Sequence, residues 1–201
     1  MGRINRVQIL YNGCFAHVFS RAVDKRNIFS DSVDFEKFKS QLLSSKQEFS
    51  FRIHHYCLMH THFHLAVSME DIGKFSEALK WVKWGYARYF NFKNTRFGPL
   101  WRDRFKSLLI ENERYMNACG RYIERNPVAA GLVTKSEDWP YSSASHYAKG
   151  KRDDLVDAYT FDGEPMLIEE NMEKSFTRGP VIGSELYKLR FEEDNAVPVP
   201  K

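Results

Sequence analysis

Histidine residues occur in this 201-residue chain at a spacing that could place two imidazoles beside one cation. Alternate side chains of a strand face opposite ways, so His62 and His64 would share one face while Phe63 and Leu65 enter the core. Two such imidazoles can chelate a divalent ion, and they need at least one further ligand from elsewhere in the chain. The alternative is that both are hydrogen-bonded surface histidines.

A phenol and an amide farther along the chain could complete such a site. Tyr122 and Asn126 are four residues apart and would therefore share a face of a helix. A tyrosine beside a cation can attack a phosphorus centre, because the cation lowers the phenol pKa and neutralises the phosphate. Alternatively, Tyr122 is a half-buried helix aromatic and Asn126 a C-terminal cap before Pro127.

Apolar periodicity and turn residues indicate the elements that must position these groups. The order is strand, helix, strand, strand, helix, strand, helix, over residues 6–22, 31–45, 49–58, 62–68, 71–91, 105–110 and 111–126. Pro127 is expected to end the last helix, because proline cannot continue the backbone hydrogen bonds.

This order predicts an α+β fold with a ferredoxin-like four-stranded antiparallel sheet, crossover helices on one face and an added catalytic helix. The added helix would cover part of the open face and approach the histidine-bearing strand. We expect one main domain over residues 1–150, followed by a C-terminal appendage and tail over residues 151–201.

Composition restricts the class of protein further. The chain has 30 Lys and Arg against 26 Asp and Glu, so the net charge of +4 permits nucleic acid binding without demanding it. Cys14, Cys57 and Cys119 form no CxxC pair and suggest a reducing compartment. No apolar run has the length of a membrane span or a signal peptide. We therefore expect a cytoplasmic protein without membrane contact.

Two motifs together resemble a known family. Residues 62–65 (His-Phe-His-Leu) and 122–133 (Tyr-Ile-Glu-Arg-Asn-Pro-Val-Ala-Ala-Gly-Leu-Val) are similar to the signature of the single-tyrosine transposases of the HUH endonuclease class. The closer resemblance is to the REP-associated, IS200-like tyrosine transposases. Supporting segments in the family's order are residues 18–21, 27–29, 100–105 and 139–143.

The resemblance implies a metal-dependent endonuclease that cuts and rejoins single-stranded or hairpin DNA. By this analogy His62, His64 and Asn126 hold Mg²⁺ or Mn²⁺, and Tyr122 forms a 5′-phosphotyrosine link while releasing a 3′-hydroxyl. Rejoining would then need no ATP. Since the ligands must be neutral imidazoles, activity is expected to fall below about pH 6.5. The protein could act as a monomer or a homodimer.

One departure from the family pattern concerns the residues before the first ligand. His60-Thr61 stands where the family usually has Pro-Asn, so His60 could be a bystander, a phosphate contact or a competing ligand. Tyr115 is a second phenol near the same helix face, but it lacks an asparagine partner. The residues expected to contact DNA are Arg21, Lys25, Arg26, Trp101, Arg102, Arg104 and Lys106.

Two alternatives remain from the residues alone. The first is a catalytically inactive regulatory module that recognises DNA or RNA hairpins by shape and loop bases. The second is a structural or regulatory protein in which His60, His62 and His64 hold zinc. Each would have to explain why Tyr122 and Asn126 are both intact.

Overall fold

The computed structural model describes residues 10–157, 159, 176, 181–185, 187 and 188. These contain strands and helices in the order predicted, with one short helix and one short strand added at the end. The elements are β1 (Phe15–Arg21), α1 (Ser32–Phe49), β2 (Phe51–Met59), β3 (His62–Met69), α2 (Ile72–Lys93), β4 (Lys106–Ile110), α3 (Glu113–Ala129), α4 (Ala144–Lys149) and β5 (Val181–Ile182).

The sheet has the strand order β2-β3-β1-β4-β5. The first four strands pair antiparallel in the ferredoxin-like order, which confirms the predicted fold class. The fifth strand was not predicted. It adds two residues in parallel at the edge of β4, where Leu109 pairs with Val181.

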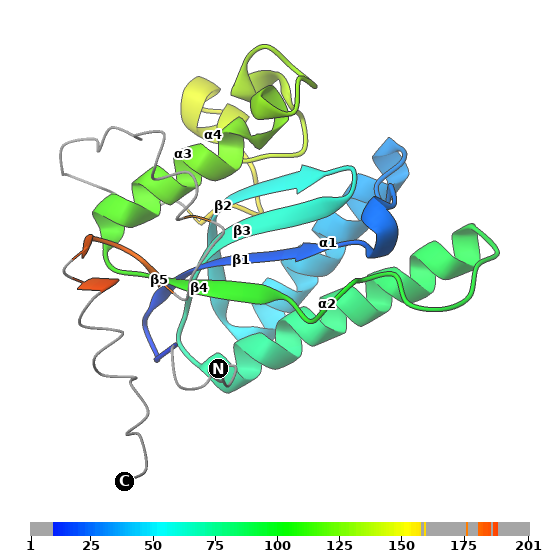
Figure 1. The fold of residues 1–201 in the computed structure, drawn as a ribbon, viewed down its shortest axis with the longest axis horizontal. Coiled ribbons are helices and arrows are strands. Elements are labelled where there is room, and N and C mark those ends of the chain that lie inside the picture. The colour runs from blue at the N-terminus through cyan, green and yellow to red at the C-terminus, as the bar shows by residue number, and fades with distance from the viewer. Residues whose placement is uncertain (1–9, 158, 160–175, 177–180, 186, 189–201) are drawn as a thin grey trace, which may run out of the picture.

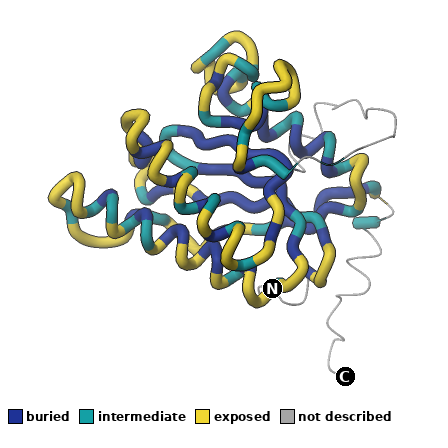
Figure 2. The backbone as a smooth tube through the Cα atoms, turned by 180° about the vertical axis from the view of Figure 1, so that it is seen from behind, coloured by how far each residue is buried: buried dark blue, intermediate teal, exposed yellow. Residues whose placement is uncertain are grey.

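The helices form a layer on each face of the sheet. Helices α1 and α2 lie together on one face, and α3 crosses the other face (Figure 1). Alternation along β1 reflects this division, because the Ser20 hydroxyl accepts a hydrogen bond from Lys83 of α2 while the His17 ring meets Tyr122 of α3. Figure 2 shows the strands as a buried layer inside helices whose outer turns are exposed.

Side-chain caps begin the three long helices at, or within one residue of, the helix starts predicted from the sequence. The carboxylate of Asp31 accepts from the Asp34 amide, and that of Asp71 accepts from the Lys74 amide, each at 3.0 Å. The Asn112 side chain accepts from the Tyr115 amide at the start of α3. Each cap satisfies an amide that has no partner within its helix.

Helix α3 does not end at Pro127, so this prediction was wrong. The helix continues to Ala129 with Pro127 inside it. Proline cannot donate to the Ile123 carbonyl, but the side-chain amide of Asn126 donates to that carbonyl at 3.2 Å instead. Gly131, with a φ of +68°, then ends the helix in the left-handed conformation that glycine adopts readily.

The outer edge of β2 is covered by chain that follows α3. The Leu58 amide donates to the Tyr141 carbonyl at 2.9 Å, and the Ser143 amide donates to the Tyr56 carbonyl at 3.0 Å. Farther along this edge, the Asp157 amide donates to the Ile53 carbonyl at 2.7 Å. These bonds occupy edge groups that could otherwise pair with another strand.

Candidate active site

The histidines of β3 lie together on the sheet face that α3 covers. His62 pairs with Arg21 and His64 with Phe19 in the register of β1 and β3. The two imidazole centroids are 5.0 Å apart. His64 is buried and His62 is partly buried. The predicted strand alternation therefore places both rings on one face.

One nitrogen of each ring is held by a neighbouring side chain. His62 Nδ1 lies 2.9 Å from the Thr61 hydroxyl, and His64 Nδ1 lies 2.9 Å from His17 Nε2. Within the described part of the chain, the two Nε2 atoms have no hydrogen-bond partner. They are the nitrogens that could face a cation, with ring orientations set by the Nδ1 contacts.

Burial keeps these imidazoles neutral. Desolvation, followed by the charge of Arg21, lowers the pKa of His62 to about 4. Desolvation also holds the pKa of His64 well below its usual value, with smaller contributions from His17, His62 and Arg21. The loss of neutral ligands expected near pH 6.5 is therefore displaced to lower pH in the folded protein.

Tyr122 approaches the histidines from α3. Its ring centroid lies 6.3 Å from that of His64 and 6.2 Å from that of His17, with nearly perpendicular ring planes. On another side it packs against Phe176 at 5.0 Å. A half-buried phenol thus stands next to one of the two predicted ligands, as its suggested role requires.

Asn126 lies about one helical turn beyond Tyr122, about 6 Å along the axis. Its Nδ2 donates to the carbonyls of Tyr122 and Ile123 at 2.9 and 3.2 Å. Because these bonds use the nitrogen, the Oδ1 atom is the one available to bind a cation. It has no hydrogen-bond partner among the residues described. The intrahelical bonds thus fix the orientation of the amide.

The chemical types of these three side chains suit a divalent cation. Two imidazole nitrogens and one amide oxygen would leave coordination positions for water or phosphate oxygen, as an open catalytic site requires. The described residues contain no group of three or more His, Cys, Asp and Glu side chains suited to a metal. The candidate set therefore depends on the asparagine as well as the histidines.

His60 does not share the strand face of His62, although an unbroken strand alternation from residue 60 to residue 64 would have placed it there. It lies in the turn between β2 and β3, where its Nδ1 is 2.7 Å from the Phe29 carbonyl. Its ring packs edge-on against Phe35 of α1 and against Trp139. The turn breaks the strand alternation, and His60 consequently joins the core on the α1 side. A zinc site of three strand histidines has no support in this arrangement.

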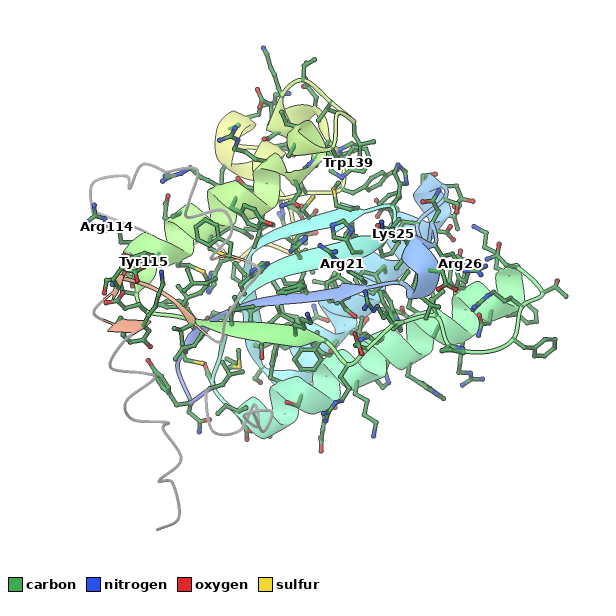
Figure 3. The ribbon with its side chains drawn as sticks, viewed as in Figure 1. Arg21, Lys25, Arg26, Arg114, Tyr115 and Trp139 are labelled. Carbon is green, nitrogen blue, oxygen red and sulfur yellow. The ribbon has the colours of Figure 1, made fainter. Side chains whose placement is uncertain are left out.

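Tyr115 lies in the first turn of α3, seven residues and about 10 Å along the helix axis from Tyr122. Figure 3 shows Tyr115 near β5, at the opposite end of the sheet from Arg21. Burial and the nearby carboxylate of Glu111 raise the pKa of the Tyr115 phenol. This environment opposes phenolate formation at Tyr115, which also lies at the end of the sheet away from Arg21, the strand partner of His62.

The predicted DNA-contacting cations are exposed at one end of the sheet. Arg21 is the last residue of β1, Lys25 ends the 3-10 turn Val23–Lys25, and Arg26 directly follows that turn (Figure 3). The Arg102 amide donates to the Arg21 carbonyl, which places the Arg102 backbone beside this group. Arg104 and Lys106 are also exposed, and the Lys106 ammonium lies 6.0 Å from the Phe19 ring centroid.

The location of Trp101 does not suit base stacking. Its indole N–H donates to the Lys83 carbonyl at 2.9 Å. Its ring packs against Phe38, Phe63 and Tyr86 in the layer between the sheet and α1 and α2. The ring therefore belongs mainly to the core on the side opposite α3.

Sequence reasoning missed His17 and the buried network beneath α3. His17 has the same strand parity as Phe15 and Phe19, so its sequence position was compatible with the core as well as with the site. Glu124 accepts from the Ser143 hydroxyl at 2.6 Å, and its Oε1 lies 2.9 Å from His55 Nδ1. Only the segment 139–143, quoted for its resemblance, hinted at this contact.

Comparisons with known proteins identify the family of the chain and relate its fold to solved structures. The family model "Transposase IS200 like" matches residues 11–126. The fold is similar to that of a REP-associated tyrosine transposase bound to a REP hairpin, with a TM-score of 0.61 and 20% identity over 84% of this chain and 100% of that chain. A candidate transposase from Deinococcus radiodurans gives a TM-score of 0.39 and 19% identity over 62% and 95% of the respective chains. No curated protein sequence matches the chain.

The family match covers more than half of the 201 residues and extends from the turn before β1 to Asn126. It thus includes both histidines of β3 and the tyrosine of α3. None of the described helices is long and apolar enough to cross a membrane. On the family match, the chain belongs to the IS200-like transposases.

Proposed function

We propose that this transposase is a metal-dependent, single-strand DNA endonuclease that cuts and rejoins DNA through a 5′-phosphotyrosine intermediate. The observation that carries the proposal is the approach of Tyr122 on α3 to His64 on β3, with ring centroids 6.3 Å apart. The sheet and the added helix supply these groups from residues 58 positions apart. A nucleophile next to candidate ligands is what phosphoryl transfer assisted by a cation needs.

In this proposal His62 Nε2, His64 Nε2 and Asn126 Oδ1 hold Mg²⁺ or Mn²⁺. The ion would polarise the scissile phosphate and neutralise its charge. The Tyr122 oxygen attacks phosphorus as its proton leaves, and the bond from phosphorus to the 3′ oxygen breaks. The products are a 5′-phosphotyrosine and a strand ending in a 3′-hydroxyl. Attack by a 3′-hydroxyl on the phosphotyrosine reverses the exchange and conserves the bond energy.

The DNA partner we propose is single-stranded or hairpin DNA. The similar REP-associated tyrosine transposase is described as bound to a REP hairpin, which supports this choice. Arg21 is the cation beside His62, and Lys25 and Arg26 continue the positive surface away from it. Such cations hold phosphates in position without reading the bases. Residues 1–150 would form the nuclease domain and residues 151–201 an appendage, in a monomer or homodimer.

Covalent trapping tests the proposal. The protein is incubated with 5′- or 3′-labelled hairpin oligonucleotides and Mn²⁺ or Mg²⁺, and adducts are resolved on denaturing gels. Wild type should retain the label located 3′ to the cut and release the other fragment. Tyr122→Phe should form no adduct, whereas the matched variant Tyr115→Phe should form it at the wild-type level.

The outcomes separate the candidate functions. Hairpin binding by wild type without any adduct would favour the catalytically inactive binding module. An adduct that persists in Tyr122→Phe would show that another residue is the nucleophile.

A further inference from the structure

A chain of two hydrogen bonds connects His64 to a backbone carbonyl from the C-terminal part of the protein. His17 Nδ1 lies 2.6 Å from the Phe176 carbonyl oxygen, and His17 Nε2 lies 2.9 Å from His64 Nδ1. His17 is fully buried on β1, and the His17 and His64 ring centroids are 5.1 Å apart. The chain thus spans β1, β3 and a residue 159 positions from His17.

The chemistry of the groups decides where the protons lie. A carbonyl oxygen can only accept, so His17 Nδ1 must carry the proton that points at Phe176. Neutral His17 then has an unprotonated Nε2, which can only accept from His64. His64 Nδ1 is therefore the donor, and neutral His64 has its lone pair on Nε2.

We propose that His17 is a positioning residue that fixes the tautomer of His64, so that Nε2 is presented as a metal ligand. This inference rests on the proposed function, because it concerns the metal site suggested there. His17 itself reaches no ligand position, since both of its nitrogens are occupied. Its effect is exerted through the orientation and basicity of His64.

His54 provides a matched control on the same face of the sheet. It is also buried, with Nδ1 at 2.8 Å from the Asp157 carbonyl and Nε2 at 2.8 Å from the Ser68 hydroxyl. His54 lies at a β-bulge of β2, between Ile53 and His55. It pairs with neither His62 nor His64. Replacement of either histidine by leucine removes two side-chain hydrogen bonds, but only His17→Leu removes a hydrogen bond to a proposed ligand.

The tautomer can be measured in metal-free wild-type protein by long-range ¹H–¹⁵N NMR of the histidine rings at pH 7.5. We expect protonated Nδ1 and unprotonated Nε2 for both His17 and His64. A protonated Nε2 on His64 would overturn the proposal. This measurement needs neither DNA nor activity, so it is independent of whether the protein cleaves.

Mn²⁺ binding, followed by electron paramagnetic resonance of the free ion, supplies the second test. His17→Leu should weaken binding by about 10- to 100-fold, the usual effect of losing a residue that orients a ligand. His17→Gln, which can still accept from His64, should recover much of the affinity, and His54→Leu should match wild type.

The failure of this inference differs from failure of the proposed function. Wild-type affinity in folded His17→Leu, with cleavage intact in wild type, would refute the role of His17 alone. Wild type that binds no Mn²⁺ would refute both. Wild type that binds Mn²⁺ through the predicted tautomer but forms no DNA adduct would refute only the cleavage reaction.

Discussion

The imidazole of His55 occupies the space where residue 120 would carry a side chain if it were not glycine. A Cβ at Gly120 of α3 would overlap the Cδ2, Nε2 and Cε1 atoms of that ring. His55 is held there by the Glu124 carboxylate at 2.9 Å and by stacking against Tyr147 at 4.6 Å. Helix α3 can therefore approach β2 closely only because position 120 has no side chain. We expect this approach to determine the distance between Tyr122, on the same helix, and the sheet.

Gly120→Ala should destabilise the protein, although alanine favours a helix by about 1 kcal/mol over glycine. Overpacking against His55 is expected to reduce the free energy of unfolding by about 1–3 kcal/mol, measured by urea denaturation. Gly85→Ala in α2 is the matched control, because its Cβ would meet only the end of the flexible Gln41 side chain. Equal stability of the two variants would contradict the close approach of α3.

Asn126→Asp should weaken α3 by removing the side-chain donor to the Ile123 carbonyl, while keeping an oxygen in the proposed ligand position. Loss of such a bond costs about 1 kcal/mol. In a Pro127→Ala background the new backbone amide can reach Ile123, so the same substitution should cost much less. A double-mutant cycle of urea midpoints measures this coupling. An equal cost in both backgrounds would show that the amide does not compensate for the proline.

His54 should make the protein less stable as the pH falls. Burial, the largest cause, holds its pKa below 6.5, and the charges of His55 and Arg52 lower the pKa further, whereas the Asp157 carbonyl and carboxylate oppose the shift. Below pH 6.5 the unfolded chain takes up a proton that folded His54 resists, so its stabilising contribution is present above pH 6.5 and is lost on acidification.

The comparison is between urea midpoints at pH 7.5 and 5.5. Wild type should lose more stability over this interval than His54→Leu does. His146→Leu, at a more exposed histidine on α4, serves as the control. If His54→Leu has the same pH dependence as wild type, this histidine does not remain neutral in the folded state.

Lys25 and Arg26 should bind phosphates of the hairpin. Replacing both by glutamine is expected to weaken binding and to reduce the slope of log affinity against log salt concentration by about 2, because two phosphates are no longer neutralised. The control replaces Lys74 and Lys80 by glutamine. These are two exposed lysines of α2, which lies on the sheet face opposite α3. Fluorescence anisotropy from low to moderate salt measures both slopes. Equal slopes for the two double variants would place the DNA elsewhere.

The amino-acid sequence by itself determined the features that depend on local backbone geometry. Alternation along a strand put His62 and His64 on one face, and the helical period did the same for Tyr122 and Asn126. The element order led to the ferredoxin-like sheet, and the predicted helix starts at residues 31 and 71 coincide with the side-chain caps Asp31 and Asp71.

Contacts between distant elements were decided only by the tertiary structure. The turn after Met59 directs His60 toward Phe29. The Trp101 ring packs in the layer between the sheet and helices α1 and α2. The close fit of His55 beneath Gly120 and the hydrogen bond from His17 to His64 depend on strand register and interlayer distance. Periodicity specifies which face of a strand or helix a residue occupies. The side chain that this residue contacts on another element depends on the strand register and on the distance between layers, and both are fixed by packing of the core.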